Sequence, residues 1–343
     1  MKAIQYTTLG GPEVLRFVDV PDPTPGPGEI VMRIQAAAMN HLDIHFRCGL
    51  PGMKTPLPHI PGSDGAGIVE AIGDGVTGIR IGDRIALNQG VACGACPVCK
   101  RGLKSLCHKY YMVGRETDGT YAELVRFPAA NAIPIPSNVS FETAAAAPLV
   151  YLTAWSMIVS KANVKKGDTV LVMGAGSGVG MAAIQIAKML GATVIATAST
   201  DEKTEKAKTV LGADHSFNYT KVPIDKEVRQ LTGKQGVDVA IDHIGGDQWV
   251  PILRATRNGG TVVTCGATAG FEPKEDLRQI FFRQIRVLGS TMGTDEEMNA
   301  VMKFVFNGKL KPLIDHTYPL KDAAEANRRM ESRESFGKIV LIP

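Results

Sequence analysis

The chain has 343 residues, which is long for a single hydrophobic core and natural for two domains. Hydrophobic residues make up 44% and charged residues 21%, values typical of globular proteins and not of disordered or fibrous ones. The net charge is +4, from 38 basic and 34 acidic residues whose signs are interspersed. Because no basic run stands out, we do not expect nucleic acid as a partner.

Neither end of the chain nor its interior predicts a membrane association. The first ten residues, MKAIQYTTLG, lack the apolar stretch of a secretory signal. The most apolar stretch, Ala144 to Val159, is shorter than a membrane span and contains Pro148, so we expect a buried helix there. A cytoplasmic location is the resulting expectation.

The first part of the chain, residues 1 to about 150, has the pattern of a β-rich, irregular domain. Short strands are predicted at Glu29 to Ile34 and Arg84 to Leu87, between glycine and proline residues. The proline-rich stretch from Pro21 to Gly28 is a turn and not a linker, because a strand pattern resumes directly after it.

From Lys166 onward, apolar strands alternate with helical segments. Strands are predicted at Asp168 to Met173, Thr193 to Thr197, Val237 to Ile241, Gly260 to Cys265 and Arg286 to Leu288. Helices are predicted at Val179 to Leu190 and from Asp201 onward. This alternation, with nearly continuous apolar strands, predicts an α/β fold whose parallel sheet is doubly wound, with helices on both faces.

The last part of the chain holds one more helical stretch, Glu296 to Phe306, and a final strand, Lys338 to Ile342. We expect this strand to return to the first domain. The predicted organisation is therefore a β-rich domain from residues 1–150 and 290–343, with an α/β domain at residues 151–289 inserted into it.

A glycine-rich turn follows the strand that ends at Met173. It reads Gly174-Ala175-Gly176-Ser177-Gly178-Val179-Gly180 and leads into a helix. Glycines let the backbone approach a pyrophosphate, and the helix N-terminus offers unpaired N–H groups and a positive dipole. The strict G-x-G-x-x-G spacing is absent, but the position between an apolar strand and an amphipathic helix predicts a dinucleotide site that includes residues 175–180.

The second strand of this domain ends where an acidic residue would bind the ribose 2′-hydroxyl of NAD. Ser199 stands there, with Lys203 nearby and no carboxylate before Asp201. A hydroxyl and a lysine suit a 2′-phosphate, so NADP(H) is expected in preference to NAD(H). In the alternative, Asp201 reaches the ribose and Lys203 is a solvated helix residue.

Four of the six cysteines lie within fifteen residues of one another. Their spacing, Cys93-x2-Cys96-x2-Cys99-x7-Cys107, brings four soft ligands together in a glycine- and proline-containing loop. This predicts a closed tetrahedral zinc site of structural type, one zinc per chain, because no position is left for water. An iron–sulfur cluster uses the same ligands and is the alternative.

These motifs resemble the medium-chain dehydrogenase/reductase superfamily. The cysteine spacing resembles the structural zinc loop of zinc-type alcohol dehydrogenases, and Pro61-Gly62-Ser63-Asp64-Gly65-Ala66-Gly67 resembles the family's glycine-rich segment. Gly82-Asp83-Arg84-Ile85 resembles the strand signature that follows it. The resemblance implies a GroES-like catalytic domain joined to a Rossmann cofactor domain.

The catalytic zinc motif of the family does not match. Where zinc-containing members carry Gly-His-Glu, this chain has Gly62-Ser63-Asp64, and Asn40 replaces a cysteine ahead of His41-Leu42-Asp43. The third ligand position, after Pro148, is apolar. A relocated site built from His41, Asp43, His59 and Asp64 is the alternative. Asn40-x2-Asp43, Leu152-Thr153-Ala154-Trp155 and the 175–180 turn instead resemble the zinc-free quinone reductases, which normally lack the cysteine lobe.

Without a catalytic metal, hydrogen-bond donors must polarise the acceptor. We expect Asn40 and Ser63 to line the substrate face beside Asp64, with Asp43 orienting a neighbour and His41 as the proton donor. In the alternative, His41 is structural, and Asp43 and Asp64 cap turns or pair with Arg47 or Arg84. The resemblance implies that Thr153 contacts the nicotinamide. It also implies that the backbone around Ile244, Gly266 and Ala267 flanks the cofactor and that Lys338 lies near it.

The expected function is NADP(H)-dependent reduction of a small carbonyl, quinone or activated alkene. Reversible alcohol dehydrogenation, with NAD or a relocated zinc, is one alternative, and a non-catalytic NADPH-binding protein is another. The resemblance implies a homodimer or homotetramer.

Overall fold

The computed structural model describes residues 1–343, which fold into two compact units. Unit 1 comprises Met1–Leu149 and Thr294–Pro343, and unit 2 comprises Val150–Gly293. Each unit is built around its own sheet and its own hydrophobic core.

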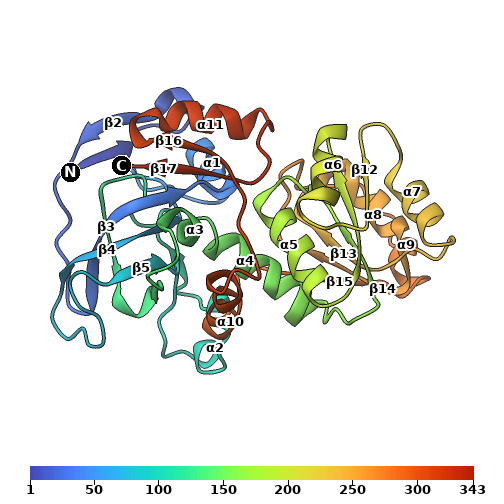
Figure 1. Cartoon of the computed structure of the whole chain (residues 1–343), viewed down its shortest axis with the longest axis horizontal. Coiled ribbons are helices and arrows are strands. Elements are labelled where there is room, and N and C mark those ends of the chain that lie inside the picture. Colours follow the sequence, from blue (N-terminus) through green and yellow to red (C-terminus); the bar gives the residue numbers. More distant parts are fainter. The chain divides into compact units, whose positions relative to one another are not determined.

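Unit 1 is built on a seven-stranded, mainly antiparallel sheet. Its strand order is β16 (Ile314–Pro319), β17 (Lys338–Ile342), β3 (Glu29–Ala38), β4 (Asp64–Ile72), β5 (Arg84–Leu87) and β9 (Ala132–Pro134), with β8 (Leu124–Pro128) also paired to β3. Two small sheets pair β1 (Lys2–Gln5) with β2 (Arg16–Asp19) and β6 (Gly90–Val91) with β7 (Tyr111–Met112). Figure 1 shows the C-terminal strands beside β3.

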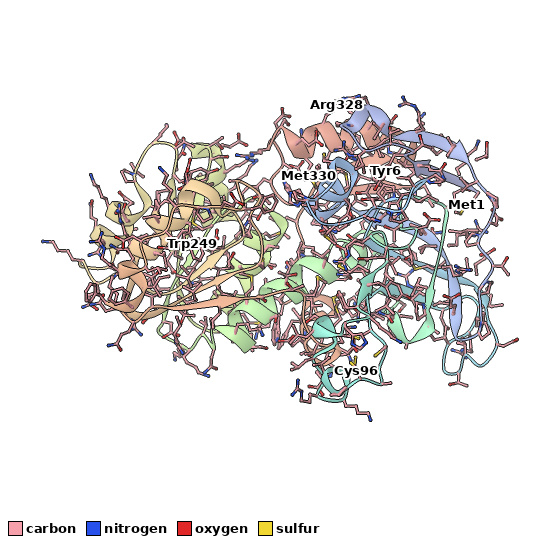
Figure 2. The ribbon with its side chains drawn as sticks, turned by 180° about the vertical axis from the view of Figure 1, so that it is seen from behind. Met1, Tyr6, Cys96, Trp249, Arg328 and Met330 are labelled. Atoms are coloured by element: carbon pink, nitrogen blue, oxygen red, sulfur yellow. The ribbon has the colours of Figure 1, made fainter.

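The helices of unit 1 are short except for those near its C-terminus. They are α1 (His41–Cys48), α2 (Pro97–Lys100), α3 (Phe141–Ala145), α10 (Asp295–Phe306) and α11 (Ala323–Glu331). Helix α11 packs on β16 and β17 and buries Met330 in the same core as Tyr6, and both side chains are labelled in Figure 2. The core thus joins residues from the two ends of the chain.

Unit 2 is a six-stranded parallel sheet. Its strand order is β12 (His215–Asn218), β11 (Thr193–Ala198), β10 (Thr169–Val172), β13 (Val237–Asp242), β14 (Thr256–Thr264) and β15 (Arg286–Gly289). The residues of β10 from Val170 to Val172 are fully buried, as expected for a parallel strand covered on both faces. The chain runs outward from β10 in one direction and from β13 in the other, so the order reverses between these two strands.

Helices connect the strands of unit 2 by crossovers. They are α5 (Gly178–Met189), α6 (Asp201–Thr209), α7 (Ile224–Leu231), α8 (Trp249–Ala255) and α9 (Arg278–Phe281). Because crossovers are right-handed, the reversal of strand order puts α5 and α6 on one face and α8 on the other. Figure 1 shows this separation, with α7 and α9 beside α8.

The structure confirms the predicted fold class, a β-rich domain and an α/β domain with a doubly wound parallel sheet. One prediction of local structure was wrong. Residues 144–159 do not form one helix, because α3 ends at Ala145, α4 (Pro148–Trp155) starts at a proline and a π-helical turn, Ser156–Lys161, follows. Proline has no N–H to continue α3, but it fits the first position of a new helix. No helix has the length and apolar character needed to span a bilayer.

Candidate functional site

A buried polar cluster in unit 1 contains four of the five predicted catalytic residues. The strand register builds it, because Ala38 of β3 lies opposite both Asp64 of β4 and Val340 of β17. Asn40, just after β3, therefore meets Lys338 at the start of β17. All members of the cluster are buried: Asn40, Asp43, Ser63, Asp64, Tyr121 and Lys338.

Asp43 forms one side of this cluster from the first turn of α1. Its carboxylate accepts hydrogen bonds from the Asn40 backbone N–H at 2.9 Å, the Ser63 hydroxyl at 2.9 Å and the Tyr121 hydroxyl at 2.9 Å. Burial raises the pKa of Asp43 to about 6, although these hydrogen bonds favour the ionised form. Tyr121 was not predicted from the sequence.

Asp64 and Lys338 form the other side. The Lys338 ammonium donates to Asn40 Oδ1 at 2.5 Å and lies 3.5 Å from Asp64 Oδ2. Asp64 also accepts from Asn40 Nδ2 at 2.9 Å and from the Leu149 backbone N–H at 3.1 Å. Burial raises the pKa of Asp64 and lowers that of Lys338, because desolvation disfavours both charges.

The hydrogen atoms of the expected donors are used inside the cluster. Asn40 Nδ2 faces Asp64 and the Ser63 oxygen, at 2.9 and 3.3 Å, and the Ser63 hydroxyl donates to Asp43. A role for Asn40 and Ser63 at a substrate therefore requires one of these bonds to rearrange. His41, the expected proton donor, is exposed at the first residue of α1, next to buried Asn40.

Asn40 and Ser63 stand at the family's zinc-ligand positions, and their amide and hydroxyl groups are hydrogen-bonded within the cluster. Lys338 adds an ammonium group beside Asn40 and Asp64. The four residues of the relocated site do not come together. His59 instead faces the carbonyl of Gly114 through Nε2 at 3.1 Å and packs edge-on against Tyr6.

The four cysteines do come together, on a small lobe of unit 1 (Cys96 is labelled in Figure 2). Sulfur–sulfur separations of 3.4, 3.5, 3.8 and 3.9 Å link Cys93, Cys96, Cys99 and Cys107. A tetrahedral zinc with Zn–S bonds near 2.3 Å needs separations of about 3.8 Å, so the set fits that ion. The backbone N–H of Lys109 points to the Cys107 sulfur at 3.3 Å.

The glycine-rich turn in unit 2 has the geometry expected of an anion site. Gly174 has a positive φ of 60°, and a Cβ on Gly180 would lie only 2.2 Å from the Gly174 oxygen. Ser177 caps α5 by accepting the Gly180 N–H at 2.9 Å. The N–H groups of Gly178 and Val179, at the first two helical positions, have no intrahelical acceptor and are available to a phosphate.

The remaining predicted cofactor residues lie in unit 2, apart from Lys338. Thr153 is buried in α4 with its hydroxyl 3.9 Å from the Met292 sulfur. Asp242 shapes the turn after β13 by accepting the N–H groups of Ile244 and Gly245, at 2.9 and 3.2 Å. Gly266 follows β14, so both turns lie at the carboxyl edge of the sheet.

The end of β11 carries the residues expected to select the cofactor. Ser199 directly follows the strand, and Lys203 is half-buried in the first turn of α6. The carboxylate of Asp201 accepts a hydrogen bond from Asn218 Nδ2 at 3.0 Å and also forms an ion pair with Lys221.

Comparisons with known proteins agree with this geometry. Residues 26–137 match the alcohol dehydrogenase GroES-like domain, and residues 178–307 match the zinc-binding dehydrogenase model. An alcohol dehydrogenase of Geobacillus stearothermophilus is 31% identical over 95% of this chain and 96% of its own length. The human quinone oxidoreductase is 29% identical over 100% of this chain and 98% of its own.

Among solved structures, an NAD-dependent alcohol dehydrogenase superposes with a TM-score of 0.96 and is 48% identical, with both chains covered completely. The two family models together match more than half of the chain, and the relatives match 95–100% of it. The chain belongs to the medium-chain dehydrogenase/reductase superfamily and is an NAD(P)-dependent oxidoreductase.

Proposed function

We propose that the protein reduces a quinone, an activated alkene or a small carbonyl with NADPH and without a catalytic metal. The observation that supports this proposal is that Asn40 and Ser63, at the positions where the resemblance places zinc ligands, are hydrogen-bonded in a buried cluster with Asp43, Asp64 and Lys338. Acceptors that are already polarised, such as quinones and enones, need less electrophilic help than a simple ketone. The substrate class follows from that requirement.

In this proposal, bound NADPH supplies the hydride and the chain positions the acceptor and moves a proton. The buried cluster holds the start of α1 rigidly through Asp43 and Asn40. His41, exposed at the first position of that helix, supplies the proton to the reduced acceptor, since an imidazole changes charge near neutral pH. Thr153 and the turns at Ile244 and Gly266 are proposed to bind the nicotinamide end.

The preference for NADP(H) is supported by the surroundings of Ser199. Asp201, the first carboxylate after the strand, is engaged by Asn218 and Lys221. Ser199 and Lys203 carry a hydroxyl and an ammonium, the groups that suit a 2′-phosphate. We therefore expect Ser199→Asp to lower the affinity for NADPH and to raise that for NADH, measured by fluorescence titration.

One zinc per chain, bound by Cys93, Cys96, Cys99 and Cys107, completes the proposal. The closed tetrahedral set leaves no position for water, so the ion stabilises the lobe and takes no part in hydride transfer. We also propose a homo-oligomer, supported by the exposed Phe281 and Phe282 near β15, the edge strand of the sheet in unit 2.

Incubation with NADPH and a simple enone, followed by mass spectrometry of the product, tests the reaction. We expect the saturated ketone, which would show that hydride reaches the alkene carbon. Wild-type protein should also hold one zinc per chain by elemental analysis. A second zinc together with an allylic alcohol would contradict the metal-free mechanism, and NADPH binding without any product would favour a non-catalytic role.

Reversible alcohol dehydrogenation is the second candidate function. The observation that favours it is the 48% identity with a structure named NAD-dependent alcohol dehydrogenase. This candidate predicts NAD-dependent oxidation of a primary or secondary alcohol. Absorbance at the NADH wavelength with a panel of alcohols separates it from the first candidate.

A further inference from the structure

His243 stands at the point where the strand order of unit 2 reverses. It directly follows β13, and the glycine-rich turn directly follows β10, the neighbouring strand. In doubly wound sheets, ligands bind in the crevice beyond the carboxyl ends of the two strands at this point. His243 was not among the residues predicted from the sequence.

The imidazole of His243 is buried against the glycine-rich turn. Its Nε2 lies 2.8 Å from the Ser177 hydroxyl oxygen, and a Cβ on Gly174 would lie 3.1 Å from the same nitrogen. The Ser177 oxygen already accepts the Gly180 N–H. A hydroxyl has one hydrogen and two lone pairs, so Ser177 can also donate its hydrogen to Nε2, and the neutral ring then carries its proton on Nδ1.

The Nδ1 atom has no hydrogen-bond partner, although it is fully buried. Burial lowers the pKa of His243 to about 4, so the ring is neutral at pH 7. In the tautomer that accepts the Ser177 hydrogen, Nδ1–H is a single, uncharged donor. Buried donors are nearly always paired in native proteins, and an unpaired one is costly. At a ligand-binding edge, such a donor points to an acceptor that arrives with the ligand.

We infer that His243 positions the dinucleotide, with Nε2 fixing Ser177 of the glycine-rich turn and Nδ1–H donating to an oxygen of the bound cofactor. This inference rests on the proposed cofactor site of unit 2. It is independent of the choice of substrate and of the proton donor His41. The acceptor is a ribose or phosphate oxygen, the groups of a dinucleotide that lie along a glycine-rich turn.

Two isosteric variants separate the roles of the two ring nitrogens. The amide of His243→Asn reaches the place of Nδ1, whereas that of His243→Gln reaches the place of Nε2. We expect His243→Gln to raise the Kd for NADPH roughly 3- to 10-fold, the effect of one lost hydrogen bond. His243→Asn keeps a donor at the place of Nδ1 and loses only the contact that fixes Ser177, so its Kd should rise less than that of His243→Gln, by about twofold. His215→Gln, at an exposed histidine on β12, is the matched control.

Fluorescence titration with NADPH, together with a thermal melt of each variant, gives the readouts. An unchanged Kd for NADPH in both variants would overturn the inference. Equally weakened NADPH binding in both variants, together with the same loss in Tm, would also overturn it, because His243 would then be a packing residue. If the wild-type protein binds neither NADPH nor NADH, the cofactor site itself fails. A normal wild-type Kd with an unaffected His243→Gln variant refutes only the role of His243.

Discussion

Two carboxylates and one ammonium are buried together around Asn40 in unit 1. The charges of Asp43 and Asp64 are separated by the amide of Asn40, which donates to one carboxylate through its side chain and to the other through its backbone. Lys338 supplies the only cation within the cluster. The arrangement is stable only while every member keeps its partner, because an unpaired buried charge is strongly destabilising.

Lys338→Met tests this dependence. The substitution leaves Asp64 buried without a cation, and we expect the free energy of unfolding to fall by about 3–5 kcal/mol. The double variant Lys338→Met/Asp64→Asn, which also removes the carboxylate charge, should recover part of the loss. Urea denaturation of wild type and both variants measures the difference, and a single variant as stable as the wild type would show that the pair is not coupled.

The raised pKa of Asp43 predicts a pH-dependent stability. Between about pH 4 and 6 the folded protein holds a proton on Asp43, whereas the unfolded chain has released it. Stability should therefore fall as the pH rises through 6. Asp64, whose pKa is also raised, contributes in the same direction, so Asp43→Asn should flatten only part of the slope. Urea denaturation at a series of pH values from 4.5 to 7.5 measures it, and a slope of opposite sign would refute the assignment.

At the scale of elements, the cysteine lobe has little structure of its own. Its strands β6 and β7 have two residues each, and its helix α2 has four. Within the lobe, Lys104 donates to the Gly90 carbonyl at 3.0 Å, and the same ammonium joins the lobe to Asp295 at the start of α10. A bound metal is therefore expected to provide most of its stability.

Cys96→Ser should remove the zinc and lower the Tm by several degrees, since loss of a ligand opens the tetrahedral set. Proteolysis should then cut between residues 93 and 107 first. Cys48→Ser, at an exposed cysteine outside the lobe, is the control and should leave both properties unchanged. Metal analysis and thermal melts provide the readouts, and a zinc content unaffected by Cys96→Ser would place the ion elsewhere.

The glycine-rich turn has no room for a side chain at Gly180, its last residue. A Cβ at Gly180 would meet the Gly174 oxygen at 2.2 Å, so Gly180→Ala must displace the turn. We expect the Kd for NADPH to rise by about tenfold or more, on the order of 1.4 kcal/mol. Gly289→Ala, where a Cβ meets no atom within 4 Å, is the matched control in β15. Equal Kd values for the two variants would show that the turn does not hold the cofactor.

The elements that carry these sites could be predicted because their signals are local. Apolar runs predicted the strands β10 and β13, and the spacing of four cysteines within fifteen residues predicted the cluster that could hold a metal. The partners in the buried cluster could not be predicted from the sequence, because Lys338 lies 298 residues from Asn40 and Tyr121 lies 78 residues from Asp43. Only the pairing of β17 with β3 brings the first of these pairs together. His243 was missed for the same reason, since its partner Ser177 is 66 residues away.

At the scale of the whole molecule, the edge of the sheet in unit 2 predicts self-association. Phe281 and Phe282 are 58% and 74% exposed, and β15 has a neighbour on one side only. Phe282→Lys should weaken association and shift the mass measured by light scattering toward the monomer, because a charge would be buried in the contact. If the wild-type protein is a monomer, or if Phe282→Lys leaves the mass measured by light scattering unchanged, the proposal that this sheet edge mediates self-association is refuted.

The position of β17 has a consequence for synthesis on the ribosome. All residues of unit 2 have been synthesised once the chain reaches Gly293. In unit 1, β3 gains its neighbour β17, and Asp64 its ion-pair partner Lys338, only when the C-terminal segment has been made. Since domains generally fold as units during synthesis, the nascent chain should fold its cofactor unit first. During that interval the N-terminal segment exposes an unpaired strand edge and lacks the cation of its buried cluster. We therefore expect the nascent chain to be most prone to aggregation at this stage.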